Sequence, residues 1–354
     1  MNRALGLARR GAGRVHPNPM VGCVIVRGGK VVGEGYHSAY GHDHAEVEAI
    51  RRAGTKARRA TLYVNLEPCA HWGKTPPCVI AIAGSGVRTV VAALKDPNPI
   101  VGGKGFTFLK KHGVRVRQGL LQQEAAELNK AFFTWVRERR PYVTLKAATS
   151  LDGKIATARG ESQWITSPAA RARGHALRAE ADAVAVGVGT VLKDNPSLTA
   201  HGKGRNPKRI IFDSALRLPP GARVTDRAAP TWVFTTSRAP SAKRRALERK
   251  GVAVYVLAND THGHVSLPEA ARVLAREGIA HLLVEGGGTL NAAFLEASLV
   301  DEMIWFIAPK IIGGETAKTA VEGVGIGKLA KAWNVKIMSV ERVGEDICIR
   351  GNLK

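Results

Sequence analysis

The stretch that most constrains this chain runs from Asp43 to Cys78 and gathers metal-binding and acid–base residues. It contains an H-x-E pair, His44 and Glu46, at the predicted start of a helix, and two cysteines, Cys69 and Cys78, that each follow a proline. One imidazole and two thiolates suit a tetrahedral Zn²⁺ ion that keeps its fourth position open for water. A carboxylate two residues past the histidine can take a proton from that water and return it to a leaving amine. The stretch therefore predicts a hydrolytic zinc site with Glu46 as the proton shuttle.

This arrangement is typical of zinc nucleobase deaminases, whose signature is H-x-E followed by P-C-x-x-C. Here eight residues separate the two cysteines, a longer spacing than in that signature. Taken alone, Asp43 and Glu46 could instead form a capping box for the predicted helix 44–53. His42 is an alternative ligand, but it lacks the helix-start position of His44. The paired cysteines favour the catalytic interpretation over simple capping.

Composition narrows the class of protein. A chain of 354 residues is long enough for two domains with separate cores. Four scattered cysteines do not make a disulfide framework, and no apolar run approaches the length of a membrane span. We therefore expect a cytoplasmic protein with no membrane partner. The formal net charge of +24 could serve nucleic acid, small phosphorylated ligands or no specific partner. Lys and Arg are spread along the chain, which favours the last two over nucleic acid.

Strands and helices are predicted to alternate in both halves, which indicates a three-layer α/β architecture for the first half and a second α/β domain after it. The basic cluster RERRP, residues 137–141, marks a linker, so we place the domain boundaries at 1–140 and 141–354. In the first half, the predicted elements after the helix 44–53 are strand 60–66, helix 78–85, strand 87–94, helix 105–112, strand 114–118 and one long helix 122–139.

Two glycine turns in the second half, residues 187–190 and 286–289, follow apolar strands and precede predicted helices. Backbone N–H groups at such turns can bind the phosphates of a dinucleotide. Neither turn is a complete G-x-G-x-x-G motif, and each alone is more often a site of tight packing. With Asp194 and Glu285 nearby, nucleotide binding and tight packing are equally good interpretations.

Longer strings resemble a known family. HPNPMVGCVIV, HAEVEA, EPCAHWGKTPPC and DPNP resemble the deaminase half of bifunctional riboflavin-biosynthesis deaminase/reductases, in the same order along the chain. TLKAATSLDGKIA, LRAEADAVAVGVGTVLKDNPSLT and LVEGGGTLNAAFLEASLVDE resemble the reductase half. The resemblance implies a cytidine-deaminase-like domain followed by a dihydrofolate-reductase-like domain. It also implies zinc-dependent hydrolytic deamination of 2,5-diamino-6-ribosylamino-4(3H)-pyrimidinone 5′-phosphate, then NADPH-dependent reduction of the ribosyl to the ribityl side chain.

The resemblance also implies roles for individual residues. The zinc ligands would be His44, Cys69 and Cys78, with Glu46 catalytic. Contacts to the pyrimidine substrate in the deaminase half would come from Asn18, His37, Lys74 and Asn98. NADPH would contact Ala148, Trp164, Thr190, Asp194, Ser214, Gly287, Gly288, Thr289, Leu290, Asn291, Ala292 and Ala293. The reductase substrate would contact Ser162, Arg178, Leu198 and Glu285, with Lys146 and Lys154 as further candidates.

One position departs from the family pattern. After the string PSLT the family usually carries an arginine two places on, where this chain has His201. Histidine is largely neutral near pH 7, so a phosphate contact there would be weaker unless Lys203 or Arg205 compensates. We further expect a homo-oligomer and a small phosphorylated pyrimidine as substrate. The competing hypotheses are a nucleic-acid-editing deaminase, which the low aromatic content of 5% disfavours, and a non-catalytic zinc scaffold.

Overall fold

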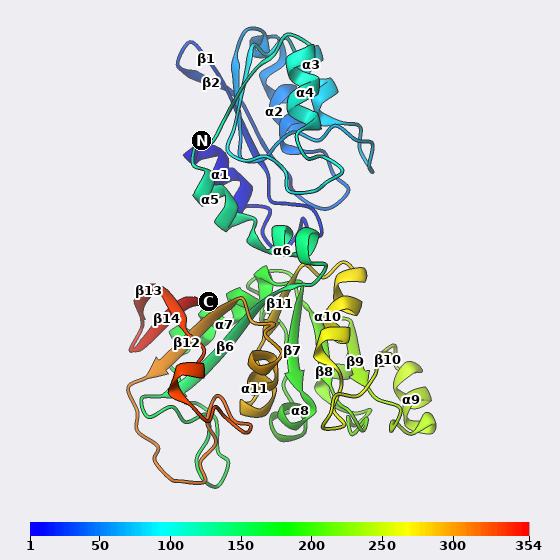
Figure 1. The fold of residues 1–354 in the computed structure, drawn as a ribbon, viewed down its shortest axis with the longest axis vertical. Coiled ribbons are helices and arrows are strands. Elements are labelled where there is room, and N and C mark those ends of the chain that lie inside the picture. Colours follow the sequence, from blue (N-terminus) through cyan, green and yellow to red (C-terminus); the bar gives the residue numbers. More distant parts are fainter. Residues whose placement is uncertain (354) are drawn as a thin grey trace. The chain divides into compact units, whose positions relative to one another are not determined.

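The computed structural model describes residues 1–353 and divides the chain into two compact units, one ending at Arg140 and one beginning at Pro141. Each unit has its own sheet and its own hydrophobic core (Figure 1). Among the described residues, no helix combines the length and apolar character needed to cross a membrane.

The first unit is built on a five-stranded sheet in the order β2–β1–β3–β4–β5. The strands β2, β1 and β3 pair antiparallel, whereas β3, β4 and β5 are parallel. Helices α2, α3 and α4 cover one face, and α1, α5 and α6 contribute to a second apolar cluster. The strands are β1 (Gly22–Arg27), β2 (Lys30–Tyr36), β3 (Thr61–Val64), β4 (Thr89–Ala92) and β5 (Arg115–Gln118). The helices are α1 (Asn2–Arg9), α2 (Ala45–Ala53), α3 (Cys78–Gly84), α4 (Lys104–Lys111), α5 (Gln122–Leu128) and α6 (Lys130–Glu138).

Two glycines on β2 allow α2 to lie directly on the sheet. A Cβ atom at Gly33 would lie 2.3 Å from the carbonyl oxygen of Ala49, and one at Gly35 would lie 2.3 Å from that of Ala45. No side chain fits in this space, so glycine is required at both positions. The close contact fixes the first turn of α2, which carries the H-x-E pair.

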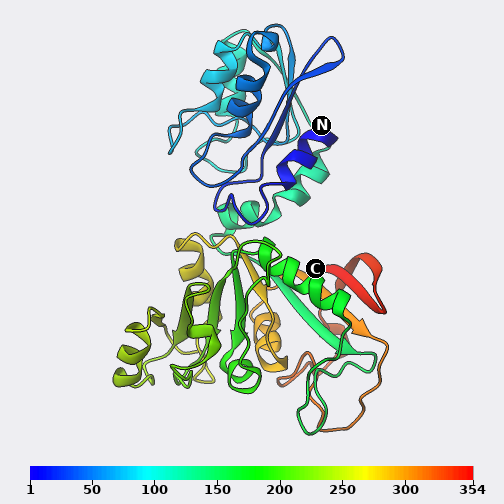
Figure 2. The ribbon, with the colours of Figure 1, turned by 180° about the vertical axis from the view of Figure 1, so that it is seen from behind.

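The second unit is built on a nine-stranded sheet in the order β10–β9–β8–β7–β11–β6–β12–β14–β13. All neighbours are parallel except the pairs formed by β14 with β12 and with β13. Helices α10 and α11 lie on one face (Figure 1), and α7 lies on the other, as the view from behind shows (Figure 2). The strands are β6 (Tyr142–Ser150), β7 (Ala183–Gly187), β8 (Lys208–Phe212), β9 (Thr231–Thr235), β10 (Ala253–Val256), β11 (His281–Val284), β12 (Glu302–Ala308), β13 (Val335–Val343) and β14 (Asp346–Leu353). The helices are α7 (Pro168–Glu180), α8 (Val188–Asp194), α9 (Ser241–Glu248), α10 (Leu267–Arg276) and α11 (Gly288–Glu296).

The predicted single helix 122–139 is wrong. Asn129 separates α5 from α6, with backbone angles φ −108° and ψ 19°. Its side-chain amide accepts a hydrogen bond from the backbone N–H of Met20 at 2.8 Å and donates one to the Met20 carbonyl at 3.0 Å. This contact with a distant part of the chain holds Asn129 outside the helical conformation.

The capping role suggested for Asp43 is also wrong. His44, not Asp43, occupies the N-cap position of α2, in extended conformation and without a side-chain capping bond. The carbonyl of Asp43 instead faces His37 Nδ1 at 3.2 Å. Glu46 is therefore not part of a capping box with Asp43.

Candidate active sites

The H-x-E pair and the two cysteines meet in the first unit. His44 precedes α2, Cys69 lies in the loop after β3, and Cys78 is the first residue of α3. One ligand atom from each of these three residues lies within 4.8 Å of the others. The Nδ1 atom of His44 is the one that faces the sulfurs, 3.1 Å from Cys78 Sγ and 3.5 Å from Cys69 Sγ. The donor set and spacing fit a zinc ion bound through one imidazole nitrogen and two sulfurs.

Neighbouring groups hold the His44 ring and the Cys69 sulfur in place. Thr75 Oγ1 lies 3.4 Å from His44 Nε2, on the side of the ring away from the sulfurs. The backbone N–H of Cys78 donates to Cys69 Sγ at 3.3 Å. The hydrogen bond with Cys78, together with that from His44, lowers the pKa of Cys69 to about 4. Cys69 is therefore a thiolate at neutral pH, the form that binds metal.

Glu46 is buried beside this cluster, with only 3% of its surface exposed. Burial raises the pKa of its carboxyl to about 7, although the charge of His44 and a hydrogen bond with Cys78 oppose the shift. A carboxyl group with a pKa near neutrality can both accept and release a proton, as general acid–base catalysis requires. Its place next to His44 and Cys78 puts it within reach of a ligand at the open metal position.

Two of the predicted substrate residues lie against this cluster. His37 is buried, and its ring meets that of His44 edge-on, with 5.1 Å between ring centroids. Asn18 Nδ2 lies 3.1 Å from His37 Nε2. Burial lowers the pKa of His37, so its ring is neutral at physiological pH. An amide and a neutral imidazole can both donate and accept hydrogen bonds, which suits the edge of a pyrimidine.

The other two predicted substrate residues make different contacts. The Lys74 ammonium lies over the ring of Tyr40, 4.1 Å from its centroid, and Lys74 is otherwise exposed. The side-chain oxygen of Asn98 accepts from the backbone N–H of Ile100 at 3.0 Å and shapes its own loop. The structure adds Asp96, which is 7% exposed and whose carboxyl pKa is raised to about 6, first by burial and further by Glu67 and Cys69. The DPNP string contained this residue, but its burial was not visible in the sequence.

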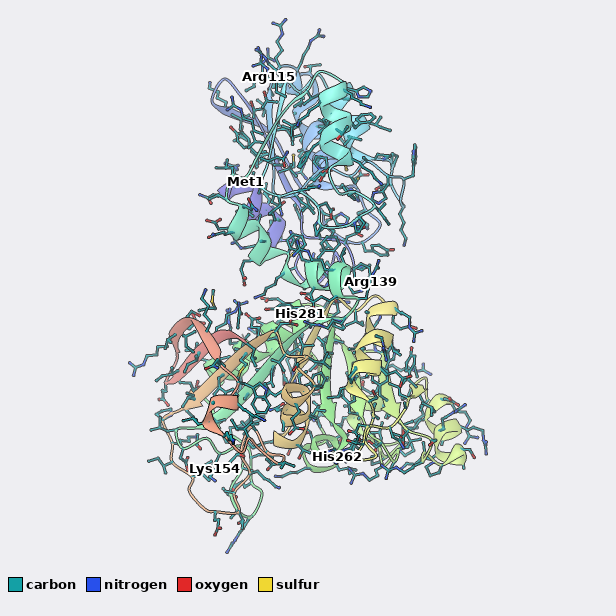
Figure 3. The ribbon with its side chains drawn as sticks, in the orientation of Figure 1. Met1, Arg115, Arg139, Lys154, His262 and His281 are labelled. Atoms are coloured by element: carbon teal, nitrogen blue, oxygen red, sulfur yellow. The ribbon has the colours of Figure 1, made fainter. Side chains whose placement is uncertain are left out.

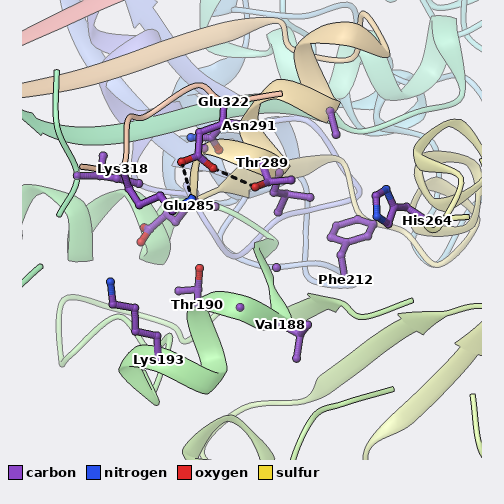
Figure 4. A pocket seen from close by; sticks show the side chains of 18 of the residues that line it. Val188, Thr190, Lys193, Phe212, His264, Glu285, Thr289, Asn291, Lys318 and Glu322 are labelled. Atoms are coloured by element: carbon purple, nitrogen blue, oxygen red, sulfur yellow. Dashed lines mark hydrogen bonds and ion pairs between the residues drawn. The ribbon is translucent and has the colours of Figure 1, made fainter. Parts of the chain in front are cut away.

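The second unit contains a cavity of about 850 Å³ at the carboxyl ends of its parallel strands. Both glycine turns line it, the first at the start of α8 and the second at the start of α11 (Figure 4). Lys154 and His262, which follow β6 and β10, lie at the same edge of the sheet (Figure 3). In open α/β sheets, this edge is where ligands bind. The predicted residues that line the cavity are Lys146, Ala148, Ser162, Thr190, Asp194, Ser214, Glu285, Gly287, Gly288, Thr289, Leu290, Asn291 and Ala293.

Five other predicted residues lie outside the cavity lining. Leu198 is 2% exposed in the apolar core, and Ala292 is a buried residue of α11 that does not face the cavity. Trp164 is 62% exposed and stacks against the guanidinium of Arg171. Lys154 donates to the carbonyl of Ala317 at 3.2 Å. The fifth, Arg178, pairs with Glu285 beside the cavity.

The glycine turn at α11 leaves room and an unpaired polar atom for a nucleotide. An added Cβ at Gly287 would meet no atom within 4 Å, so the backbone there borders open space. Asn291 Oδ1 is buried and has no hydrogen-bond partner within residues 1–353, while its Nδ2 donates to Ala320. Cavity volume, glycine backbone and an unpaired acceptor fit a cofactor that carries phosphates and an amide. Lys193 and Lys318, which no sequence pattern singled out, also line the cavity (Figure 4).

Arg178 and Glu285 form a bidentate ion pair beside the cavity. The Arg178 guanidinium donates to the two carboxylate oxygens at 3.0 and 2.6 Å, and to the carbonyl of Thr199 at 3.1 Å. Burial alone would raise the pKa of Glu285, but the charges of Arg178 and Lys146 lower it to about 2. The carboxylate is therefore charged at neutral pH and held in one orientation, with its edge exposed to the cavity.

His201 stacks on a second histidine. The rings of His175 and His201 have centroids 4.2 Å apart and planes inclined by 25°. His201 Nε2 lies 3.3 Å from Ser197 Oγ. Burial and the charges of Arg178 and Arg223 lower the pKa of His201, so both rings are neutral at physiological pH when no anion is bound.

Comparisons with known proteins also distinguish a first and a second part of the chain. Residues 1–94 match the model of the cytidine and deoxycytidylate deaminase zinc-binding region, and residues 141–349 match that of the RibD C-terminal domain. The riboflavin biosynthesis protein RibD of Bacillus amyloliquefaciens is 45% identical, over 98% of this chain and 94% of its own length. The Escherichia coli RibD is 43% identical, over 99% of this chain and 97% of its own length.

Solved structures extend the similarity to the fold. Acinetobacter baumannii RibD superposes with a TM-score of 0.91 at 38% identity, over 100% of this chain and 97% of that one. A Thermotoga maritima diaminohydroxyphosphoribosylaminopyrimidine deaminase/5-amino-6-(5-phosphoribosylamino)uracil reductase superposes with a TM-score of 0.89 at 38% identity, with the same coverage.

The fold and the two sites define a bifunctional enzyme with a zinc-binding deaminase domain and a reductase domain. The chain belongs to the RibD family of riboflavin biosynthesis proteins. The expected cytidine-deaminase-like and dihydrofolate-reductase-like folds are thereby confirmed, as are zinc and NADPH as the cofactors.

Proposed function

We propose that this chain removes the amino group of 2,5-diamino-6-ribosylamino-4(3H)-pyrimidinone 5′-phosphate in its first unit and then reduces the ribosyl chain to ribityl in its second. The observation that carries the proposal is the cluster of His44, Cys69 and Cys78 with buried Glu46 beside it. The glycine-lined cavity in the other unit supports the second step. The similar Thermotoga maritima protein is named for the same two activities.

In the deaminase step, zinc held by His44, Cys69 and Cys78 would supply an activated water near neutral pH. Glu46 would accept a proton at its carboxylate and deliver it to the leaving amine, so that ammonia departs uncharged. Asn18 and His37 would orient the pyrimidine through hydrogen bonds to its edge. Lys74, which is exposed and cationic, would pair with the phosphate.

In the reductase step, NADPH would supply the hydride, and the protein's contribution is to place the nicotinamide against the sugar carbon. The backbone at Gly287 would approach the cofactor, because no atom lies within 4 Å of the position of an added Cβ there. Ser162 Oγ donates to Asp194 Oδ1 at 3.3 Å, and both groups line the cavity where the sugar would lie. Glu285, fixed by Arg178, would accept hydrogen bonds from the substrate.

Removal of the metal tests whether deamination and reduction take place in different units of the chain. After dialysis against a chelator, the full chain should lose deamination but still reduce the deaminated intermediate with NADPH, because the two sites lie in separate units. Atomic emission measures the metal content, the rate of ammonia release measures deamination, and the loss of NADPH absorbance measures reduction. Undiminished deamination by a chain without metal contradicts the proposed zinc site.

Filling the glycine turn should weaken cofactor binding. We expect Gly287→Val to raise the Kd for NADPH by at least about tenfold, a loss of about 1.4 kcal/mol, because its side chain enters space that the cofactor needs. Its backbone φ of −76° is open to any residue, so the fold should persist. Gly221→Val, at another glycine with no atom near its Cβ position, is the matched control. Equal NADPH affinity of the two variants, by fluorescence titration, would remove the turn from the cofactor site.

Position 201 should control affinity for the phosphorylated reductase substrate. We expect His201→Arg to lower its KM several-fold at pH 8, where the histidine is neutral, because a permanent guanidinium binds phosphate bidentately. A charge-assisted hydrogen bond of about 1.5–3 kcal/mol sets the upper bound of the gain. The difference in KM between wild type and His201→Arg should be smaller at pH 6, where a bound phosphate favours the protonated form of His201. His112→Arg, at an exposed position in the first unit, is the control. An equal KM for wild type and His201→Arg at pH 8 excludes this role.

We further propose that the protein acts in the cytoplasm, where pyrimidine phosphates and NADPH are available, and that it works as a homo-oligomer. None of the four cysteines forms a disulfide, which supports a reducing compartment.

A further inference from the structure

Two buried asparagine side chains, Asn65 and Asn129, hold the backbone of Met20. Asn129 accepts a hydrogen bond from the Met20 N–H at 2.8 Å and donates one to the Met20 carbonyl at 3.0 Å. Asn65 donates to the same carbonyl at 2.9 Å and accepts from the N–H of Gly22 at 2.8 Å. Asn65 and Asn129 are 0% and 2% exposed. These two side chains, the amide pair, donate and accept as the backbone of a neighbouring strand would.

The segment that the amide pair holds is not fixed by strand pairing. Residues 16–20 precede β1 and belong to no helix or strand. Pro17 and Pro19 lack an N–H group, so they cannot donate to a neighbouring strand. Met20 directly follows the second proline, and both of its polar backbone groups are hydrogen-bonded. The amide pair therefore fixes the end of the segment that carries Asn18.

Asn18 lies against the metal-binding cluster. Its Nδ2 atom is 3.1 Å from Nε2 of His37. The His37 ring, which is 2% exposed, meets the ring of His44 with 5.1 Å between centroids. Because only Pro19 separates Asn18 from Met20, a displacement of the Met20 backbone moves the Asn18 amide as well.

We propose that Asn65 and Asn129 are positioning residues for deamination, which hold Asn18 against the pyrimidine without contacting the substrate themselves. This role depends on the proposed function, in which Asn18 orients the pyrimidine ring. A hydrogen-bonding group that is already held in place loses less conformational entropy when the substrate binds, so holding it increases affinity. An ionised aspartate at position 65 or 129 would only accept, and one of its oxygens would face the carbonyl oxygen of Met20. Two buried acceptors that face each other are unfavourable, so the amide is required at both positions.

A double-mutant cycle on the full chain tests this role. Asn129→Asp should raise the KM for deamination by about fivefold, the equivalent of one hydrogen bond, and leave NADPH-dependent reduction unchanged. Asn18→Ala, which removes the substrate contact itself, should raise the KM at least as much. In the double variant, Asn129→Asp should add nothing to the effect of Asn18→Ala, because no contact is left to position. Independent structural damage would instead multiply the two effects.

Two further variants distinguish positioning from loss of folding. Asn65→Asp disrupts the amide pair from its other side and should give the same result, alone and combined with Asn18→Ala. Asn2→Asp, the same chemical change at an exposed position of α1, is the matched control and should leave the KM unchanged. Circular dichroism and zinc content show whether each variant is folded around its metal.

A wild-type KM in folded Asn129→Asp and Asn65→Asp overturns the proposal, as does a multiplied effect in the double variants. A wild-type KM in Asn18→Ala overturns it too, because Asn18 then makes no contact with the substrate. Loss of folding or of zinc in both aspartate variants also contradicts it, because the amide pair is then required by the whole unit. Absence of deamination by the wild-type chain removes the proposed function itself, and this failure is visible without any variant.

Discussion

Glu46→Gln should lower the turnover of deamination by about 10²- to 10⁴-fold, the range that general acid–base catalysis contributes. Glutamine has the same shape as glutamate but cannot accept and release the proton. The cluster of His44, Cys69 and Cys78 should still bind zinc, because none of the three ligand atoms changes. NADPH-dependent reduction of the deaminated intermediate should proceed at the wild-type rate.

Glu48→Gln is the matched control for this substitution. Glu48 lies on the same helix two residues later and forms surface ion pairs with Arg51 and Arg52 at 2.5 Å. Its replacement should leave both activities intact, since exposed ion pairs contribute about 0–1 kcal/mol. Ammonia release by Glu46→Gln at the wild-type rate, with zinc bound, would show that another group moves the proton.

Arg178→Met is expected to destabilise the second unit by about 3–5 kcal/mol, because it leaves the carboxylate of Glu285 buried without its partner. Methionine fills similar space but donates no hydrogen bond. Hydrogen exchange of β11 and α7 amides in a urea series, followed by mass spectrometry, reports this unit separately from the first. Arg173→Met, an exposed position on the same helix, should change protection by less than about 0.5 kcal/mol.

The same pair predicts how stability depends on pH. The pKa of Glu285 is lowered to about 2 in the folded chain, from an ordinary value of 4.5. A depressed carboxyl pKa contributes stability that is fully present above 4.5 and is lost as the pH falls towards 2. The protection difference between wild type and Arg178→Met should therefore narrow across this window. A difference that stays constant from about pH 6 to about pH 3 contradicts the assigned ion pair.

The sequence predicted those parts of the fold and the sites that depend on residues close together along the chain. His44, Cys69 and Cys78 come together because a short helix start, a strand end and a second helix start follow one another within residues 43–78. The two glycine turns were visible for the same reason, and both line one cavity. Each glycine turn was visible on its own, but only the sheet shows that they lie side by side, because β7 and β11 are neighbours in the sheet and far apart along the chain.

Features set by distant contacts were not predictable in this way. The break at Asn129 depends on a contact with Met20, 109 residues away. β13 was missed because it is exposed on both faces and shows no burial pattern. Leu198 was selected by resemblance, yet its side chain is part of the core, and only the folded chain shows this. The burial of Asp96, whose backbone N–H donates to a carboxylate oxygen of Glu67 at 3.1 Å, is likewise visible only in the folded chain.

The most direct test of deamination followed by reduction is the mass of the products that the purified full chain makes from the diamino substrate, with and without NADPH. Without NADPH, we expect a single product in which oxygen has replaced one amino group. With NADPH, we expect that product to gain two hydrogens as the ribosyl chain becomes ribityl. An unchanged substrate mass, or addition of hydrogens with both amino groups retained, contradicts the two consecutive steps in one chain.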